Sequence, residues 1–184
     1  MGNGGYKIRS QTLPHFITFA IVDWLDVFTG KLYCNIVLNC IRYCQKEKSM
    51  NLFAWCLMSN HFHMISASKI GDLSGLLRDF KKFTSKQIIT AIQGNKAEIR
   101  REWMLEIFKK WGEDNSRNKE FQLWRQDNQP QELFGAKFIY QKLNYIHMNP
   151  VPVGIVELPE HYLYSSAKNY AFRKKCGLLD ISWI

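Results

Sequence analysis

Two strand-like segments separated by only two residues constrain the fold of this chain more than any other feature. Residues 52–58 form a continuous apolar run of strand length, and residues 61–68 alternate in polarity. The dipeptide Ser59-Asn60 between them is typical of a tight turn. The sequence therefore predicts a β-hairpin, and the rest of the chain has to build a sheet around it.

The segments on either side of this hairpin predict two further strands and four helices. Residues 13–22 are rich in Phe, Ile, Thr and Val, which predicts a strand, and residues 121–125 predict a last strand. Asp72 is a typical N-cap, and Pro150 is expected to end a helix. Apolar residues at helical spacing predict helices over residues 31–48, 72–92, 96–111 and 133–149.

Large side chains define the predicted apolar faces of these helices. The face of the first helix consists of Leu32, Ile36, Cys40 and Tyr43, and that of the second consists of Leu73, Leu76, Leu77, Phe80 and Phe83. Trp103 and Trp111 lie at helical spacing in the third, and we assign them to the core or to an interface.

The order of the predicted elements is typical of an α+β fold. It predicts an antiparallel sheet with helices packed over it, close to the split βαβ arrangement. We find no repeat and no linker that would divide the chain. We therefore expect a flexible lead over residues 1–10, a single domain over residues 11–170, and a tail over residues 171–184. Proline and glycine residues between positions 150 and 159 predict turns that lead the C-terminal part of the chain around the domain.

Composition excludes two classes of protein and favours one kind of partner. With 46% hydrophobic and 14% aromatic residues, the 184-residue chain is not a disordered protein. No apolar run reaches the length of about 20 residues that a membrane span needs, and no signal peptide is visible. The 25 Lys and Arg against 16 Asp and Glu residues give a net charge of +9, which favours a polyanionic partner.

The cysteines indicate a reducing compartment. The chain has five cysteines: Cys34, Cys40, Cys44, Cys56 and Cys176. Their number is odd and none forms a C-x-x-C pair, while Cys40 and Cys44 are four residues apart in a predicted helix. We expect reduced, structural cysteines in a cytoplasmic protein.

The tripeptide His61-Phe62-His63 is the sharpest candidate for chemistry. On a strand, residues i and i+2 point to the same side, so the two imidazoles can converge on one metal ion. In an isolated H-x-H pair, however, two half-exposed histidines at a strand edge, or one buried and hydrogen-bonded histidine, are more common than a metal site.

The segment from Tyr145 to Pro150 is a second candidate. At spacing i, i+4, Tyr145 and Asn149 lie on one face of a helix. Taken alone, the pair also fits an amphipathic tyrosine near a helix end and an ordinary helix stop. His147 points elsewhere, and we interpret it as structural.

Together these segments resemble the single-tyrosine HUH transposases, in particular the REP-associated tyrosine transposases, over residues 12–170. The motifs that carry the resemblance are Met58-Ser59-Asn60-His61-Phe62-His63; Phe121-Gln122-Leu123-Trp124; the run from Tyr145-Ile146 through Asn149-Pro150-Val151 to Gly154; and Pro159, Tyr162, Tyr164-Ser165-Ser166 and Tyr170.

The resemblance implies a ferredoxin-like HUH nuclease and strand transferase that acts on single-stranded DNA folded into hairpins at its ends. It implies that Tyr145 is the nucleophile, forming a 5′-phosphotyrosine intermediate. It also implies that His61, His63 and Asn149 bind a divalent metal, Mg²⁺ or Mn²⁺. Imidazole and amide ligands suit Mn²⁺ readily, whereas Mg²⁺ prefers oxygen.

DNA binding is expected on a basic stripe and at one aromatic–cation pair. The stripe on the helix after the hairpin consists of Arg78, Lys81, Lys82 and Lys86, and a solvated polar face is its alternative interpretation. Trp124 and Arg125 combine a stacking surface with a cation, although Trp124 also fits the core.

Two other functions stay open at this point. The chain fits a non-catalytic or domesticated single-stranded nucleic-acid-binding protein of the same fold. A structural zinc protein is a weaker alternative, because no third and fourth ligand lie at suitable spacing. Related transposases often form homodimers, so we consider a homodimer as well.

Overall fold

The computed structural model describes residues 8–113, 120–126 and 130–184. Residues 1–7 of the lead that the sequence predicts therefore lie outside the described residues. No helix in the described part of the chain is long and apolar enough to cross a membrane.

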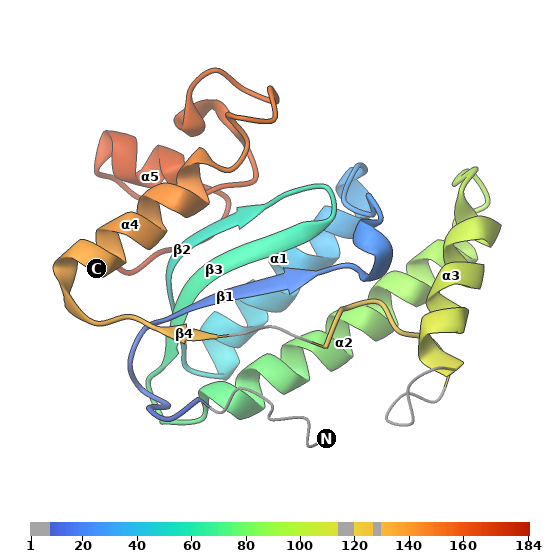
Figure 1. Ribbon diagram of the computed structural model, residues 1–184, viewed down its shortest axis with the longest axis horizontal. Coiled ribbons are helices and arrows are strands. Elements are labelled where there is room, and N and C mark those ends of the chain that lie inside the picture. Colours follow the sequence, from blue (N-terminus) through green and yellow to red (C-terminus); the bar gives the residue numbers. More distant parts are fainter. Residues whose placement is uncertain (1–7, 114–119, 127–129) are drawn as a thin grey trace.

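A four-stranded antiparallel sheet forms the centre of the molecule (Figure 1). Its strands are β1 (His15–Ala20), β2 (Met50–Leu57), β3 (His61–Ser68) and β4 (Gln131–Glu132), in the order β2-β3-β1-β4. The predicted hairpin is confirmed, and so is the split βαβ arrangement, because β3 lies between β1 and β2.

The predicted last strand over residues 121–125 is wrong. Only Trp124 forms a bridge there, with Ile21, and the fourth strand comes later, at Gln131–Glu132. The reason is that this segment divides its backbone hydrogen bonds between two elements. The amide of Gln122 donates to the carbonyl of Phe108 in a helix, so no continuous ladder can form.

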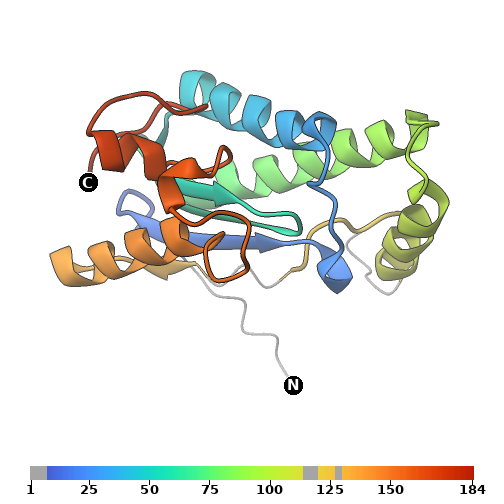
Figure 2. The same cartoon turned by 90° about the horizontal axis from the view of Figure 1, so that it is seen from above.

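All four predicted helices are present, and they cover both faces of the sheet. They are α1 (Lys31–Glu47), α2 (Leu73–Gly94), α3 (Arg101–Glu113) and α4 (Gly135–Met148), followed by the short α5 (Ala167–Phe172). Two 3₁₀ turns, Val22–Trp24 and Pro159–His161, complete the elements of the described residues. Helices α1 and α2 pack on one face and α4 on the other, as Figure 2 shows.

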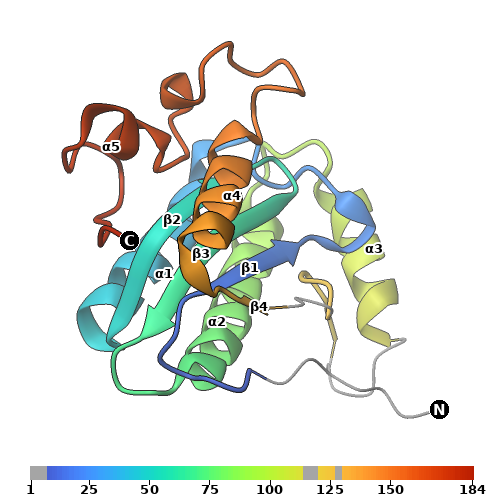
Figure 3. The same cartoon turned by 60° about the vertical axis from the view of Figure 1, so that its left-hand side comes forward.

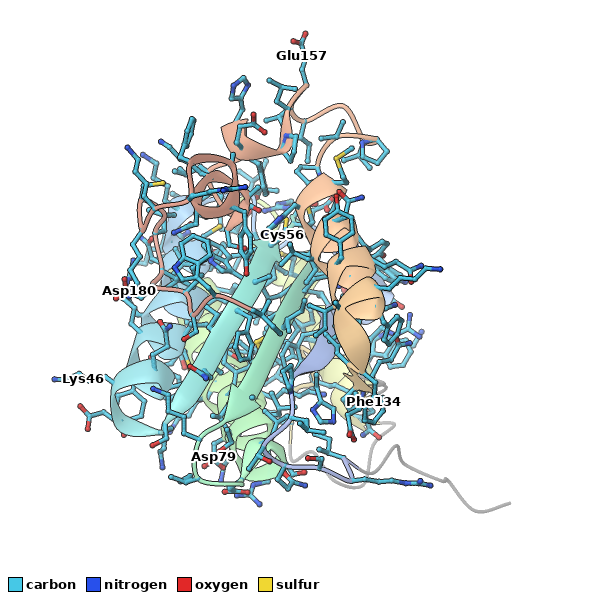
Figure 4. The ribbon with its side chains drawn as sticks, turned by 90° about the vertical axis from the view of Figure 1, so that its left-hand side faces the viewer. Lys46, Cys56, Asp79, Phe134, Glu157 and Asp180 are labelled. Atoms are coloured by element: carbon cyan, nitrogen blue, oxygen red, sulfur yellow. The ribbon has the colours of Figure 1, made fainter. Side chains whose placement is uncertain are left out.

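The two faces are clearest from the side of the sheet. Figure 4 shows Lys46 of α1 and Phe134, just before α4, on opposite sides of the strands. In Figure 3, α4 lies across strands β2 and β3.

Alternation along β3 divides its side chains between two apolar clusters. Phe62 and Met64 point into the larger cluster with α1 and α2, whereas Ile65 belongs to the smaller cluster with α4. His61 and His63 have the same parity as Ile65. The two histidines therefore lie on the α4 side of the sheet.

The helix periods were predicted correctly, and most of the predicted face of α2 is buried, namely Leu73, Leu76, Leu77 and Phe80. Leu32, Tyr43 and Phe83 are exposed, contrary to the prediction. Trp103 and Trp111 are exposed too, so they are not core residues, and their assignment to an interface stays a prediction. In α1 and α3, the buried residues lie on a different side of the helix from these exposed positions. They include Cys34, Val37 and Ile41 in α1 and Met104, Phe108 and Gly112 in α3. A helical period is compatible with more than one face of the helix, and the presence of large apolar side chains did not identify the buried one.

Trp124 is a correction of the predicted DNA-stacking residue. Its side chain is only 3% exposed, and its ring packs against Phe19, Phe28 and Phe80 in the larger cluster. Its Nε1 donates a hydrogen bond of 2.9 Å to Thr84 Oγ1. Because no face of the ring is open to a base, Trp124 is a core residue.

The C-terminal part of the chain covers the free edge of β2. Backbone amides of Ser166 and Ser182 donate to carbonyls of β2, and the hydroxyls of Tyr162 and Tyr170 donate to the carbonyls of Leu57 and Phe53. Residues of the predicted tail also enter the larger cluster, with Leu179 and Ile181 as its members. The edge of the sheet is thus covered by the chain's own tail.

Candidate active site

The hairpin and the end of α4 meet at one point on the sheet. The Nε2 atom of His61 lies 3.1 Å from Oδ1 of Asn149, and the ring centroid of His63 lies 5.3 Å from that of Tyr145. The two imidazole centroids are 4.7 Å apart. The structure therefore brings together the four residues that the sequence singled out on the hairpin and on the tyrosine helix.

The tautomer of His61 is set by Asn60. The amide nitrogen of Asn60 donates to the carbonyl of Trp24 at 3.2 Å, which turns its Oδ1 toward His61 Nδ1 at 2.7 Å. The Oδ1 atoms of Asn60 and Asn149 both accept only, and a neutral imidazole carries one proton, which we assign to Nδ1 because its contact is the shorter one. In the neutral ring, Nε2 then presents a lone pair to Oδ1 of Asn149, another acceptor. Two facing acceptors form a favourable site for a cation.

His63 is held by a neighbouring strand. In the register of β1 and β3 it pairs with Thr18, whose Oγ1 lies 2.8 Å from Nδ1 of His63. Its ring stacks on Phe16 at 5.4 Å. These contacts fix the ring and leave Nε2 as the nitrogen with no partner assigned among the described residues.

Both imidazoles are neutral at pH 7. Burial, followed by the charges of His61 and Lys142, lowers the pKa of His63 to about 3. Burial also lowers the pKa of His61, although the oxygen of Asn149, which would accept a hydrogen bond from the protonated ring, opposes the shift. The neutral imidazole is the form that binds a metal ion.

Tyr145 is more exposed than Tyr162 and Tyr170. Its side chain is 50% exposed, while its ring contacts those of His63 and Phe16. Tyr162 and Tyr170, by contrast, use their hydroxyls on the backbone of β2, and burial raises the pKa of Tyr170 to about 12. These contacts give Tyr162 and Tyr170 packing roles.

Asn149 follows α4 in a helical conformation. Its φ of −51° and ψ of −42° continue the helix geometry, although proline at the next position disfavours this region. The predicted end of the helix at residue 149 is right to one residue. Because the helix geometry continues, Asn149 stays on the same side of α4 as Tyr145.

Lys142 is a neighbour of the site that the sequence analysis missed. It lies one turn before Tyr145, and its Nζ is 4.6 Å from the ring centroid of Phe16, 5.5 Å from that of Phe138 and 5.9 Å from that of Tyr145. No carboxylate pairs with it among the described residues. The i, i+3 spacing to Tyr145 was the signal that could have identified it.

Thr18 and Trp24 were also missed. Thr18 could only be found through the pairing of β1 with β3, which joins residues 45 positions apart. Trp24 is half-exposed, and its ring lies 5.8 Å from that of His61. No motif marked either residue.

The predicted basic stripe does not lie at the histidine pair. Helix α2 covers the opposite face of the sheet from α4. Arg78 pairs with Asp79 at 3.2 Å, and Nζ of Lys81 donates to the carbonyl of Arg125 at 2.7 Å. Lys82 and Lys86 are exposed. A DNA contact of this stripe therefore stays a prediction and concerns a different surface from that of α4.

The alternative of a structural zinc protein finds no support in the described part of the chain. There, no three or more His, Cys, Asp or Glu side chains gather in a way that could hold a metal ion. The histidine pair has an amide as its nearest third ligand instead. All five cysteines are free, in agreement with the expectation of reduced thiols.

Comparisons with known proteins agree with this fold. Residues 14–111 match the family described as "Transposase IS200 like", and the chain belongs to this family. It is a transposase, an enzyme of DNA transposition. The matched segment includes His61 and His63 but ends before Tyr145.

A solved structure of a REP-associated tyrosine transposase bound to a REP hairpin has the same fold. The TM-score is 0.62, the identity is 16%, and the match covers 99% of this chain and 96% of that chain. No curated protein matches the sequence. The predicted family and fold class are thus confirmed.

His147 has a structural environment, as expected. It is buried, its Nε2 lies 2.8 Å from Ser166 Oγ, and burial lowers its pKa to about 4. Because an unfolded histidine titrates near pH 6.5, the unfolded state takes up a proton first as the pH falls. The folded state is then penalised between pH 6.5 and pH 4.

We predict that His147→Gln makes the protein less sensitive to acid. Glutamine can retain the contact with Ser166 but does not titrate. Between pH 7 and pH 5, the free energy of unfolding should fall by about 2 kcal/mol less in this variant than in the parent. Urea unfolding at each pH measures this difference. His161→Gln, at an exposed position, is the control, and equal acid sensitivity of His147→Gln and the parent would contradict the prediction.

Proposed function

We propose that this transposase is a metal-dependent single-stranded DNA endonuclease and strand transferase with Tyr145 as its nucleophile. The observation that carries the proposal is the meeting of an accessible tyrosine with two imidazoles and one amide oxygen, groups that are able to bind a metal ion. Tyr145 contacts His63, and the lone pair on Nε2 of His61 points toward a lone pair on Oδ1 of Asn149. This combination fits phosphodiester chemistry better than packing alone.

The proposed substrate is a DNA strand with a hairpin near the cleavage point. Two observations support it: the net charge of +9, and a protein of the same fold that has been solved with a REP hairpin bound. The half-exposed position of Tyr145 is open enough for a flexible single strand to approach.

The residues at the site fit a divalent metal. His61 and His63 would bind it through Nε2, because Asn60 and Thr18 occupy their Nδ1 atoms, and Asn149 would bind it through Oδ1. This donor set suits Mn²⁺, and Mg²⁺ would depend more on water and phosphate oxygens. The ion would neutralise charge on the scissile phosphate.

The reaction conserves the energy of the phosphodiester bond. The oxygen of Tyr145 attacks the phosphorus, the bond from phosphorus to the 3′ oxygen breaks, and that oxygen takes up a proton as the tyrosine loses one. DNA is then joined to Tyr145 through its 5′ phosphate. A 3′ hydroxyl can later attack this linkage, release the tyrosine and rejoin DNA without ATP.

All of these side chains come from one chain. The contact of Tyr145 with His63 of its own chain supports attack in cis, without a second copy. A homodimer and a cytoplasmic location stay predictions.

We predict that Tyr145→Phe abolishes a covalent protein–DNA adduct without loss of DNA binding. The change removes the attacking oxygen and almost no volume. Single strands from the flanking genomic repeats, incubated with Mn²⁺, should give an adduct with the parent on a denaturing gel, and EDTA should prevent it. Mass spectrometry should then locate the nucleotide on the peptide that contains Tyr145.

Tyr140→Phe is the matched control, since Tyr140 lies on the same helix and is 70% exposed. This variant should form the adduct like the parent. A nucleotide on another tyrosine would refute the role of Tyr145. Failure of the parent to form an adduct with any DNA strand and either metal would favour the alternative, a non-catalytic or domesticated DNA-binding protein.

Lys142 is proposed to stabilise charge at the reacting phosphate. Its ammonium group lies between the rings of Phe16, Phe138 and Tyr145 and close enough to His63 to oppose that residue's protonation. A cation without a carboxylate partner among the described residues, beside the proposed nucleophile, suits a phosphate oxygen as its counter-charge.

We predict that Lys142→Met lowers the rate of adduct formation about 100-fold at saturating DNA, as expected for the loss of one donor to transition-state charge. Lys142→Arg should recover part of the rate, because it restores the charge. Lys137→Met removes a similar charge from an exposed position on the same helix and should react like the parent. Equal rates for Lys142→Met and Lys137→Met would exclude a specific role for Lys142.

A further inference from the structure

An exposed tryptophan lies beside the histidine pair, and its ring has no role in the chemistry proposed above. Trp24 ends the 3₁₀ turn after β1 and is 51% exposed. Its ring meets that of His61 edge to face, at a centroid distance of 5.8 Å and an angle of 78°. His61 thus contacts Trp24, while His63 contacts Tyr145.

The loop holds Trp24 in a conformation that large residues rarely adopt. Asp23 and Trp24 are consecutive residues with φ values of 52° and 54°, in the left-handed region. Side chains other than glycine, asparagine and aspartate are uncommon in this region, and such strain persists where the surroundings enforce it.

The surroundings of the loop enforce this conformation from both sides. The amides of Ile21 and Phe28 donate to the carbonyls of Asn60 and Ser59 in the β2–β3 turn, at 2.9 Å and 2.7 Å. The side-chain amide of Asn60 donates to the carbonyl of Trp24 itself. The backbone is therefore fixed to the hairpin that carries the histidines, while the indole ring extends into solvent.

A guanidinium group accompanies the ring. Cζ of Arg125 lies 5.7 Å from the ring centroid of Trp24. The sequence predicted a pair of tryptophan and arginine at Trp124 and Arg125. The fold retains the arginine but supplies a different tryptophan, because Trp124 is buried.

We propose that Trp24 is a stacking platform for an unpaired nucleobase close to the scissile phosphate, with Arg125 beside the same nucleotide. The inference rests on the proposed single-stranded DNA substrate and adds a binding site to it. A flat ring that is half-exposed, fixed to the catalytic hairpin and paired with a cation has the properties of a base-stacking surface. Stacking there would hold the strand across the histidine pair.

The test measures binding rather than cleavage, in EDTA, so that it does not depend on a metal or on Tyr145. The first probe is a labelled DNA hairpin with a single-stranded oligothymidylate tail, and the second carries abasic sites in place of the thymines. The variants are Trp24→Ala and Trp24→Phe. Trp103→Ala is the matched control, because Trp103 is 53% exposed and lies on α3.

Trp24→Ala should bind the thymine tail about 10-fold more weakly than the parent and the abasic tail equally well, since only a base can stack. Trp24→Phe should retain most of the affinity, and Trp103→Ala should bind both probes like the parent. Thermal unfolding of each variant verifies that the fold is intact.

Two results would overturn the platform while leaving the proposed reaction in place. One is equal binding of both probes by Trp24→Ala and the parent. The other is an equal loss on both probes, in Trp24→Ala and Trp24→Phe alike, which would assign Trp24 to the structure of the loop. Failure of the parent to bind either probe would instead refute the single-stranded DNA substrate, and the platform with it.

Discussion

The packing of α4 on β3 is the interaction on which the site depends. Ile146 is fully buried in the smaller cluster with Phe16 and Ile65, and this contact fixes the rotation of α4 about its axis. Once Ile146 points inward, the spacing of the helix directs Tyr145 and Asn149 toward the histidines of β3. A rotation of α4 by one residue would separate Asn149 from His61 and Tyr145 from His63. The packing of Ile146 thus determines where Tyr145 and Asn149 lie relative to the two histidines.

The polar site is held by a second set of contacts that reach it from the other strands and loops. Thr18 on β1 orients His63, and Asn60 in the hairpin turn orients His61. Asn60 is itself oriented by the carbonyl of Trp24, so the strained loop after β1 contributes to the tautomer of His61. Burial keeps both imidazoles neutral, which is the state in which their lone pairs are available.

The parts of this arrangement that the sequence predicted are those that depend on local spacing. Strand β3 begins at His61 as predicted because a two-residue turn and alternating polarity mark it, and the i, i+4 spacing correctly placed Tyr145 and Asn149 on one face. What could not be predicted depends on pairing between distant segments. Thr18 faces His63 only through the register of two strands, and a strand of two residues, β4, leaves no periodic signal. Trp24 and Trp124 differ in burial, which their immediate neighbours do not reveal.

The central claim is that the hairpin and α4 together form one metal site beside Tyr145. It is tested most directly by anomalous diffraction from crystals of the protein soaked with Mn²⁺. We predict a single strong anomalous peak within coordination distance of Nε2 of His61, Nε2 of His63 and Oδ1 of Asn149. A peak bound elsewhere, coordination through either Nδ1, or no peak at the histidine pair at saturating Mn²⁺ would contradict it.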